Sequence, residues 1–103
     1  MFIKSEQKKL AYQMLVFDEV VNKGSFTLAA HSLGHTKSAV SLYITQLETA
    51  LDTRLLTRST RTLNLTPSGE LLVKRSEQLV NLLSDTLQDL DTYNNEPAGR
   101  IAI

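Results

Sequence analysis

Two short stretches of the chain carry the side chains best suited to binding chemistry. The first holds Lys37, Ser38 and Ser41, which offer one ammonium group and two hydroxyls within five residues. The second runs from residue 54 to residue 66 and holds three arginines without one acidic residue. Ammonium, guanidinium and hydroxyl groups donate hydrogen bonds to phosphate oxygens and to acceptor atoms at the edges of heterocyclic rings. The residue types therefore favour recognition of a polyanion.

Residues for catalysis or metal binding are scarce. His31 and His35 lie four positions apart, but the chain has no cysteine, and no paired carboxylates accompany the two histidines. They would also straddle a helix end and a turn, and no glycine-rich phosphate loop is present. We therefore predict no catalytic residue, no metal ligand and no cofactor in this chain.

Two predicted helices position the first polar stretch. Ser25 is a preferred N-cap residue, and the helix that follows it ends at Gly34. Its inward residues are expected to be Phe26, Leu28, Ala29, Ala30 and Leu33. Thr36 can cap a second helix over residues 36–51, whose apolar stripe is Val40, Ile44, Leu47 and Leu51. This is the helix-turn-helix pattern, although all-α domains that bind no nucleic acid can share it.

The charged residues, whose charges sum to zero over the 103 residues, are unevenly distributed along the chain. Residues 1–35 carry +1, residues 36–66 carry +2 and residues 67–103 carry −3. In the basic third, two β-prone runs flank a polar tip and predict a hairpin over residues 55–65. After a helix-turn-helix such a hairpin is a wing, and Arg54, Arg58 and Arg61 would suit a phosphate backbone. The alternative is a plain surface loop with scattered arginines.

The flanking segments predict two more helices. One begins near Leu10 and ends at Gly24, while residues 1–9 either fray or extend it backwards. The other begins after Thr66 and runs to residue 94, about 40 Å. A three-helix head cannot cover such a helix, so its apolar stripe should pair with a second copy. The stripe contains Val73, Val80, Leu83, Leu87 and Leu90.

Composition places the chain among small globular domains, with 42% hydrophobic and 21% charged residues. No apolar run reaches the length of a membrane span, and no signal-peptide pattern opens the chain. Together with the absence of cysteine, this predicts a cytoplasmic protein without a membrane partner.

In combination, these motifs resemble the amino-terminal domain of a LysR-type transcriptional regulator. The resemblance covers about residues 13–103. Its residues are Phe17, 24–30, Leu33, 38–41, Ile44, 47–48, Leu51, 54–58 and 65–70. Three positions depart from the family pattern. Lys37 stands where the family frequently has glutamine, Leu42 where it frequently has arginine, and Asp52 where it frequently has glycine.

The resemblance implies a mainly α fold with three parts. Residues 1–66 would form a winged helix-turn-helix head of three helices and a β-hairpin. Residues 67–94 would form a dimerising linker helix, and residues 95–103 a hinge and the start of an effector-binding domain. The implied partners are a second copy of the chain and, for the full-length protein, a small-molecule effector. A tetramer is a further option for the full-length protein.

The implied function is sequence-specific binding of double-stranded DNA at an interrupted dyad by a bacterial regulator. Helix 36–51 would enter the major groove, and wing 55–65 would lie on the backbone or in the minor groove. By position in the family, the base-facing residues are Lys37, Ser38, Ser41 and Leu42. Contacts to the DNA backbone would come from Ser25, Thr27, Thr36, Arg58 and, at the wing tip, Arg61. The alternative is a helical dimerisation or partner-binding module without DNA readout, which the long helix alone would support.

Overall fold

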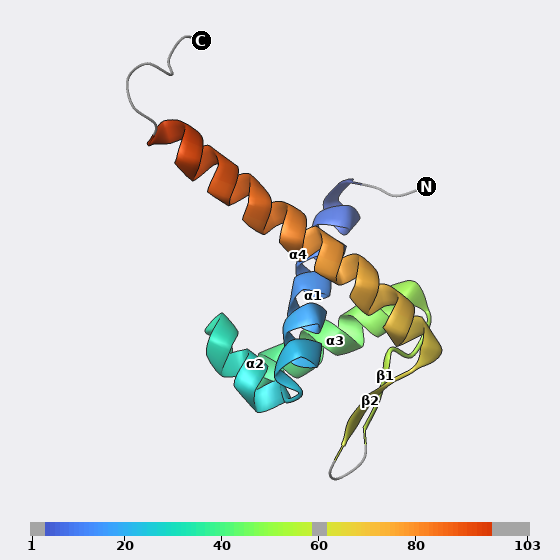
Figure 1. Cartoon of the computed structure of the whole chain (residues 1–103). Coiled ribbons are helices and arrows are strands. Elements are labelled where there is room, and N and C mark those ends of the chain that lie inside the picture. The colour runs from blue at the N-terminus through green and yellow to red at the C-terminus, as the bar shows by residue number, and fades with distance from the viewer. Residues whose placement is uncertain (1–3, 59–61, 96–103) are drawn as a thin grey trace.

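The computed structural model of the chain describes residues 4–58 and 62–95. In this part of the chain, three helices, a two-stranded hairpin and a long fourth helix follow one another (Figure 1). Their bounds are α1 Lys4–Lys23, α2 Phe26–Leu33, α3 Lys37–Leu51, β1 Leu56–Arg58, β2 Leu63–Leu65 and α4 Pro67–Asn94. The predicted mainly α, winged-helix architecture is therefore confirmed. α1 extends the predicted first helix backwards to Lys4, whereas residues 96–103, predicted as a hinge and the start of an effector-binding domain, lie outside the described residues.

Hydroxyl caps begin three of the helices, as the sequence predicted. The side-chain oxygens of Ser25, Thr36 and Thr66 each accept a hydrogen bond from the backbone amide three residues later, at 3.0–3.1 Å. Each cap satisfies one amide that would otherwise lack a partner at a helix start. α2 ends at Gly34 with φ 74°, and α3 ends at Asp52 with φ 53°. Asp52 therefore adopts the left-handed conformation that glycine would adopt more easily.

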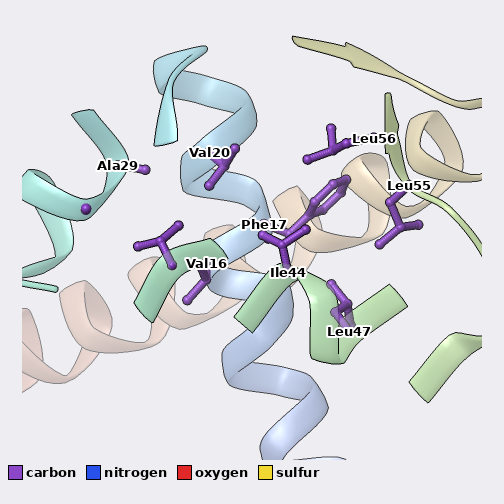
Figure 2. Packing of buried hydrophobic residues seen from close by; sticks show 10 residues of the cluster. Val16, Phe17, Val20, Ala29, Ile44, Leu47, Leu55 and Leu56 are labelled. Carbon is purple, nitrogen blue, oxygen red and sulfur yellow. The ribbon is translucent and has the colours of Figure 1, made fainter. Parts of the chain in front are cut away.

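One hydrophobic core joins the three head helices to the base of the hairpin (Figure 2). Its buried members are Val16, Phe17, Val20, Ala29, Ala30, Val40, Ile44, Leu47, Leu55 and Leu56. Two expected members differ, because Leu28 is 55% exposed and Leu51 is 37% exposed. The inward face of α2 is the narrower set 26, 29, 30 and 33, and position 28 lies outside that spacing. Leu51 is the last residue of α3, beyond the end of the head core.

The hairpin is short and antiparallel. Leu56 pairs with Leu65, Thr57 with Asn64 and Arg58 with Leu63. In Figure 1 the hairpin projects from the head beside the start of α4. The predicted wing is thus present, while its tip residue Arg61 lies outside the described residues.

α4 starts against the head and then extends beyond it (Figure 1). Leu72 and Val73 pack against the core, and Ser76 is fully buried. The expectation that Val73 has no partner in the head is therefore wrong. Every residue from 81 to 95 is exposed, which leaves about 20 Å of helix uncovered within one copy. In the described residues, the helices lack the combination of length and hydropathy that a membrane span requires.

A buried carboxyl group lies where α1 meets α4. Asp18 is 4% exposed and accepts a hydrogen bond from Asn22 at 3.0 Å through Oδ2, while Oδ1 is buried without a hydrogen-bond partner among the described residues. Burial raises the pKa of Asp18 above its ordinary value of 3.8, and the charges of Glu77 and Glu19 raise it further. The Asn22 hydrogen bond lowers the pKa but does not offset the other causes.

Replacing Asp18 by asparagine should therefore raise the melting temperature at pH 7. Because the folded-state pKa of Asp18 exceeds the unfolded value, its contribution to stability is largest below pH 3.8 and falls as pH rises through the folded-state pKa. The gain in Asp18→Asn should accordingly vanish near pH 3. Thermal melting at both pH values checks this, with the exposed Asp85→Asn as a control. A lower melting temperature for Asp18→Asn at pH 7 would contradict a raised pKa of Asp18 in the folded state.

Candidate nucleic-acid interface

The outward face of α3 brings the predicted base-facing residues together. Lys37, Ser38 and Leu42 are exposed and Ser41 is half-buried, and all four line one shallow depression. Thr45 also lines this depression, although sequence reasoning did not select it as a site residue. Its hydroxyl donates to the Ser41 carbonyl at 3.0 Å, which leaves the hydroxyl oxygen able to accept a hydrogen bond. The signal in the sequence was its position eight residues after Lys37, on the same helix face.

The amino-terminal ends of α2 and α3 both suit an anion. Neither helix has an acidic residue in its first turn. Thr27 and Thr36 are exposed there, and Ser25 is half-buried. Backbone amides at a helix start carry a partial positive charge and attract phosphate. The residues predicted to contact the DNA backbone in this region therefore lie at two favourable ends.

The turn between α2 and α3 is braced by aromatic rings that sequence reasoning missed. The Tyr12 hydroxyl hydrogen-bonds His35 Nε2. The Tyr43 ring lies 5.2 Å from the Tyr12 ring and 5.3 Å from the His35 ring, between centroids. These contacts join α1, the turn and α3, and no local sequence pattern reveals pairs so distant along the chain. Among the described residues, no group of three or more potential metal ligands lies together.

The arginines of the hairpin region differ in their surroundings. Arg54 lies 3.6 Å from the Glu48 carboxylate and donates to the Leu56 carbonyl at 3.3 Å. The stretch 54–66 lacks acids in sequence, but the fold brings one from α3 beside its first arginine. Arg58 is the last residue of β1, at the outer end of the described hairpin. Arg58 is therefore the described arginine placed farthest out along the wing.

Known proteins match this fold and these elements. Residues 12–70, more than half of the chain, match the family described as bacterial regulatory helix-turn-helix protein, lysR family. The chain is 36% identical over 91 residues to the HTH-type transcriptional activator AaeR of Escherichia coli, covering 88% of this chain and 29% of AaeR. It is 39% identical over 90 residues to the HTH-type transcriptional regulator PtxR of Pseudomonas aeruginosa, covering 87% of this chain and 29% of PtxR. The chain thus spans less than a third of the length of these relatives.

Solved structures agree with the sequence relatives. A BenM_DBD/catB site 1 DNA complex superimposes with a TM-score of 0.74 at 25% identity, covering 84% of this chain and 98% of that chain. The oxidized form of Corynebacterium glutamicum OxyR superimposes with a TM-score of 0.73 at 27% identity, covering 82% of this chain and 26% of that chain. On this combined sequence and structural similarity, the chain belongs to the LysR family of bacterial regulatory helix-turn-helix proteins.

Proposed function

We propose that this chain binds double-stranded DNA in a sequence-specific manner as part of a transcriptional regulator, with α3 in the major groove. The observation that carries the proposal is the outward face of α3, where an ammonium, two hydroxyls and an apolar side chain share one depression. Base edges in the major groove offer acceptors, donors and thymine methyl groups to such a set. The similarity to a solved DNA complex supports DNA binding by this chain.

Each side chain has a separate role in this proposal. Lys37 donates to guanine O6 and N7, the hydroxyls of Ser38 and Ser41 serve several base edges, and Leu42 contacts a thymine methyl group. Four further residues contact the DNA backbone, namely Ser25, Thr27, Thr36 and Arg58. Backbone contacts hold the register of the protein on the duplex, whereas base contacts select the sequence.

A partner-binding helical module is the rival function, and a salt titration separates the two. Binding to random duplex DNA should weaken steeply as salt rises, because each neutralised phosphate releases condensed counterions. A protein-interaction module would show no such slope. Selection of bound sites from a random DNA pool would then supply the operator sequence for the variants below.

We also propose that two copies pair through α4. Leu83, Leu87 and Leu90 are all exposed in one copy, and Val80 is half-buried at the start of the same stripe. An apolar groove continues the stripe toward the head and is lined by residues of α1, α3 and α4, including Leu10, Leu51, Leu79 and Leu82. An apolar surface of this extent is typical of an interface.

Charge favours antiparallel pairing of the two α4 helices. The first half of α4 holds two basic residues, Lys74 and Arg75, and two acidic ones, Glu70 and Glu77, whereas the second half holds only acidic residues, Asp85, Asp89 and Asp91. An antiparallel pair centred near Leu83 brings the neutral first half of each helix, which contains Lys74 and Arg75, beside the acidic second half of its partner. A parallel pair would instead place the two acidic second halves together, which is unfavourable. Antiparallel α4 helices relate the two heads by a two-fold axis, and this symmetry matches that of an interrupted dyad in DNA.

The proposal divides the chain into three parts. Residues 1–66 are the proposed DNA-binding head and residues 67–94 the proposed linker and dimerisation helix. Residues 95–103 are proposed to lead to an effector-binding domain, and all of them but Asn95 lie outside the described residues. The proposed full-length protein is a cytoplasmic, non-enzymatic regulator that responds to a small molecule, and a tetramer is one assembly open to it.

Replacing Arg58 by alanine should weaken binding to all DNA sequences alike. The loss of one phosphate contact should reduce the slope of log affinity against log salt by about 1. Fluorescence anisotropy at several salt concentrations measures the slope, and Arg58→Lys, which keeps the charge, should retain it. A slope in Arg58→Ala equal to that of the unmodified chain would refute a phosphate contact by this residue.

A further inference from the structure

One carboxylate of α3 holds the base of the wing. Glu48 Oε2 accepts hydrogen bonds from the backbone amides of Leu55 at 2.8 Å and Leu56 at 3.2 Å. The Glu48 side chain is only 15% exposed, so water competes little for these bonds. Charge-assisted hydrogen bonds to backbone amides are stronger than neutral ones. The first residue of β1 and the residue before it are thereby tied directly to α3.

Two further contacts of Glu48 involve the same segment between α3 and β1. The Thr53 amide donates to the Glu48 carbonyl at 3.1 Å, so Glu48 binds the chain through both its backbone and its side chain. Arg54 lies 3.6 Å from the carboxylate but its side chain is 70% exposed, and an exposed ion pair contributes little. The two amides are therefore the partners of Glu48 that matter for the wing.

The opposite side of the wing base is held by the start of α4. Thr66 donates from its hydroxyl to the Arg54 carbonyl at 2.6 Å and from its amide to the Leu55 carbonyl at 3.0 Å. The fit is close, because a Cβ added at Gly69 would lie 2.1 Å from the Leu55 carbonyl oxygen. Residues 54–56 are thus fixed between α3 on their amide side and α4 on their carbonyl side.

Beyond this base, the wing projects away from the head (Figure 1). Leu55 and Leu56 are 1% exposed and anchor in the core, whereas Thr57 is already exposed. A small rotation at residues 54–56 would therefore displace Arg58 relative to α3. DNA binding through both elements requires that their separation match the spacing of groove and phosphate backbone.

We propose that Glu48 is a positioning residue for DNA binding, which holds the wing in the place where it engages the DNA backbone while α3 occupies the major groove. The proposal rests on the proposed phosphate contact of Arg58. It makes an unusual prediction of sign. A carboxylate near bound DNA repels phosphate, so its charge alone predicts that removing Glu48 strengthens binding. Positioning predicts that removing Glu48 weakens it.

The experiment compares Glu48→Ala and Glu48→Gln with Asp52→Asn in the full chain. Asp52 lies one helical turn further along at the end of α3, is exposed, and accommodates asparagine in its left-handed conformation. Asp52→Asn therefore removes a similar charge without touching the wing base. Affinity for random and selected duplexes is measured over a salt series, and thermal melting reports whether each head is folded.

We expect Glu48→Ala to reduce the salt slope by about 1, as Arg58→Ala does, and Arg58→Ala to add nothing in a Glu48→Ala background. Glu48→Gln keeps an acceptor oxygen and should lie between Glu48→Ala and the unmodified chain, and it carries the test if Glu48→Ala does not fold. Asp52→Asn should bind DNA as tightly as the unmodified chain or slightly more tightly.

Two results would overturn the proposal. One is an unchanged or tighter affinity in the Glu48 variants, as in Asp52→Asn. The other is an additive loss in the double variant, which would show that Glu48 does not act through the wing. Failure of the phosphate contact itself is recognised separately, because Arg58→Ala alone would then leave the salt slope unchanged.

Discussion

Replacing both Leu83 and Leu90 by alanine should leave the chain monomeric at micromolar concentration. The two side chains lie on the exposed stripe of α4 and would be buried against a second copy. Removing a buried leucine side chain costs about 2–5 kcal/mol, and a two-fold interface contains each substitution twice. Each 1.4 kcal/mol changes the dissociation constant about tenfold. The four truncated side chains therefore cost at least about 8 kcal/mol, and the dissociation constant should rise by more than about five orders of magnitude. Sedimentation or light scattering detects the resulting monomer.

Leu71→Ala is the matched control for this pair of substitutions. Leu71 is 62% exposed on the same helix but lies about 120° around it from Leu83. It should leave the dimer unchanged. The head of the double variant should remain folded, because the core residues lie in the head and in the first turns of α4. A monomeric unmodified chain at high protein concentration would refute pairing through α4.

The same double variant should bind a full dyad site far more weakly than the unmodified chain. Two heads held at a fixed spacing bind the second half-site at a high effective concentration, which separate heads lose. Affinity for an isolated half-site should change little, since the head makes that contact alone. Equal losses on both targets would mean that α4 affects the head itself.

Features encoded by neighbouring residues could be predicted from the sequence. The hydroxyl caps at Ser25, Thr36 and Thr66 act on amides three residues away, so a short stretch contains both partners. The stripe of Val40, Ile44 and Leu47 follows from helix periodicity in the same way. The prediction that Leu28 points inward is wrong, because its position lies outside the buried face of α2 although leucine is apolar.

Contacts between distant segments could not be predicted from the same signals. The bond between Tyr12 and His35 joins residues 23 positions apart, and Glu48 binds amides seven and eight positions later through a chain reversal. Local propensity contains no information on such pairs, because they form only when helices pack. The proximity of Arg54 to Glu48 likewise could not be predicted, because the stretch that begins at Arg54 contains no acidic residue of its own. The predicted base-facing residues could be selected together because one face of α3 contains all of them.

Replacing Lys37 by alanine should weaken binding at the selected site by about 1–3 kcal/mol and relax the base preference there. Lys37 is exposed at the first position of α3, beside the depression formed with Ser38 and Leu42. A side chain at this place can donate to guanine O6 and N7, a pair of acceptors that no other base presents in the major groove. Binding to the selected duplex and to random duplexes gives the two affinities to compare.

Two further variants separate base recognition from charge. Lys37→Arg keeps the donors and should retain the preference for guanine, because a guanidinium binds the same two acceptors. Lys8→Ala removes an exposed lysine of α1 that does not line the depression on α3, and it should affect neither affinity nor preference. An equal loss on selected and random DNA in Lys37→Ala would make Lys37 a phosphate contact. Base selection by this helix would then depend on the hydroxyls of Ser38 and Ser41 and on the Leu42 side chain.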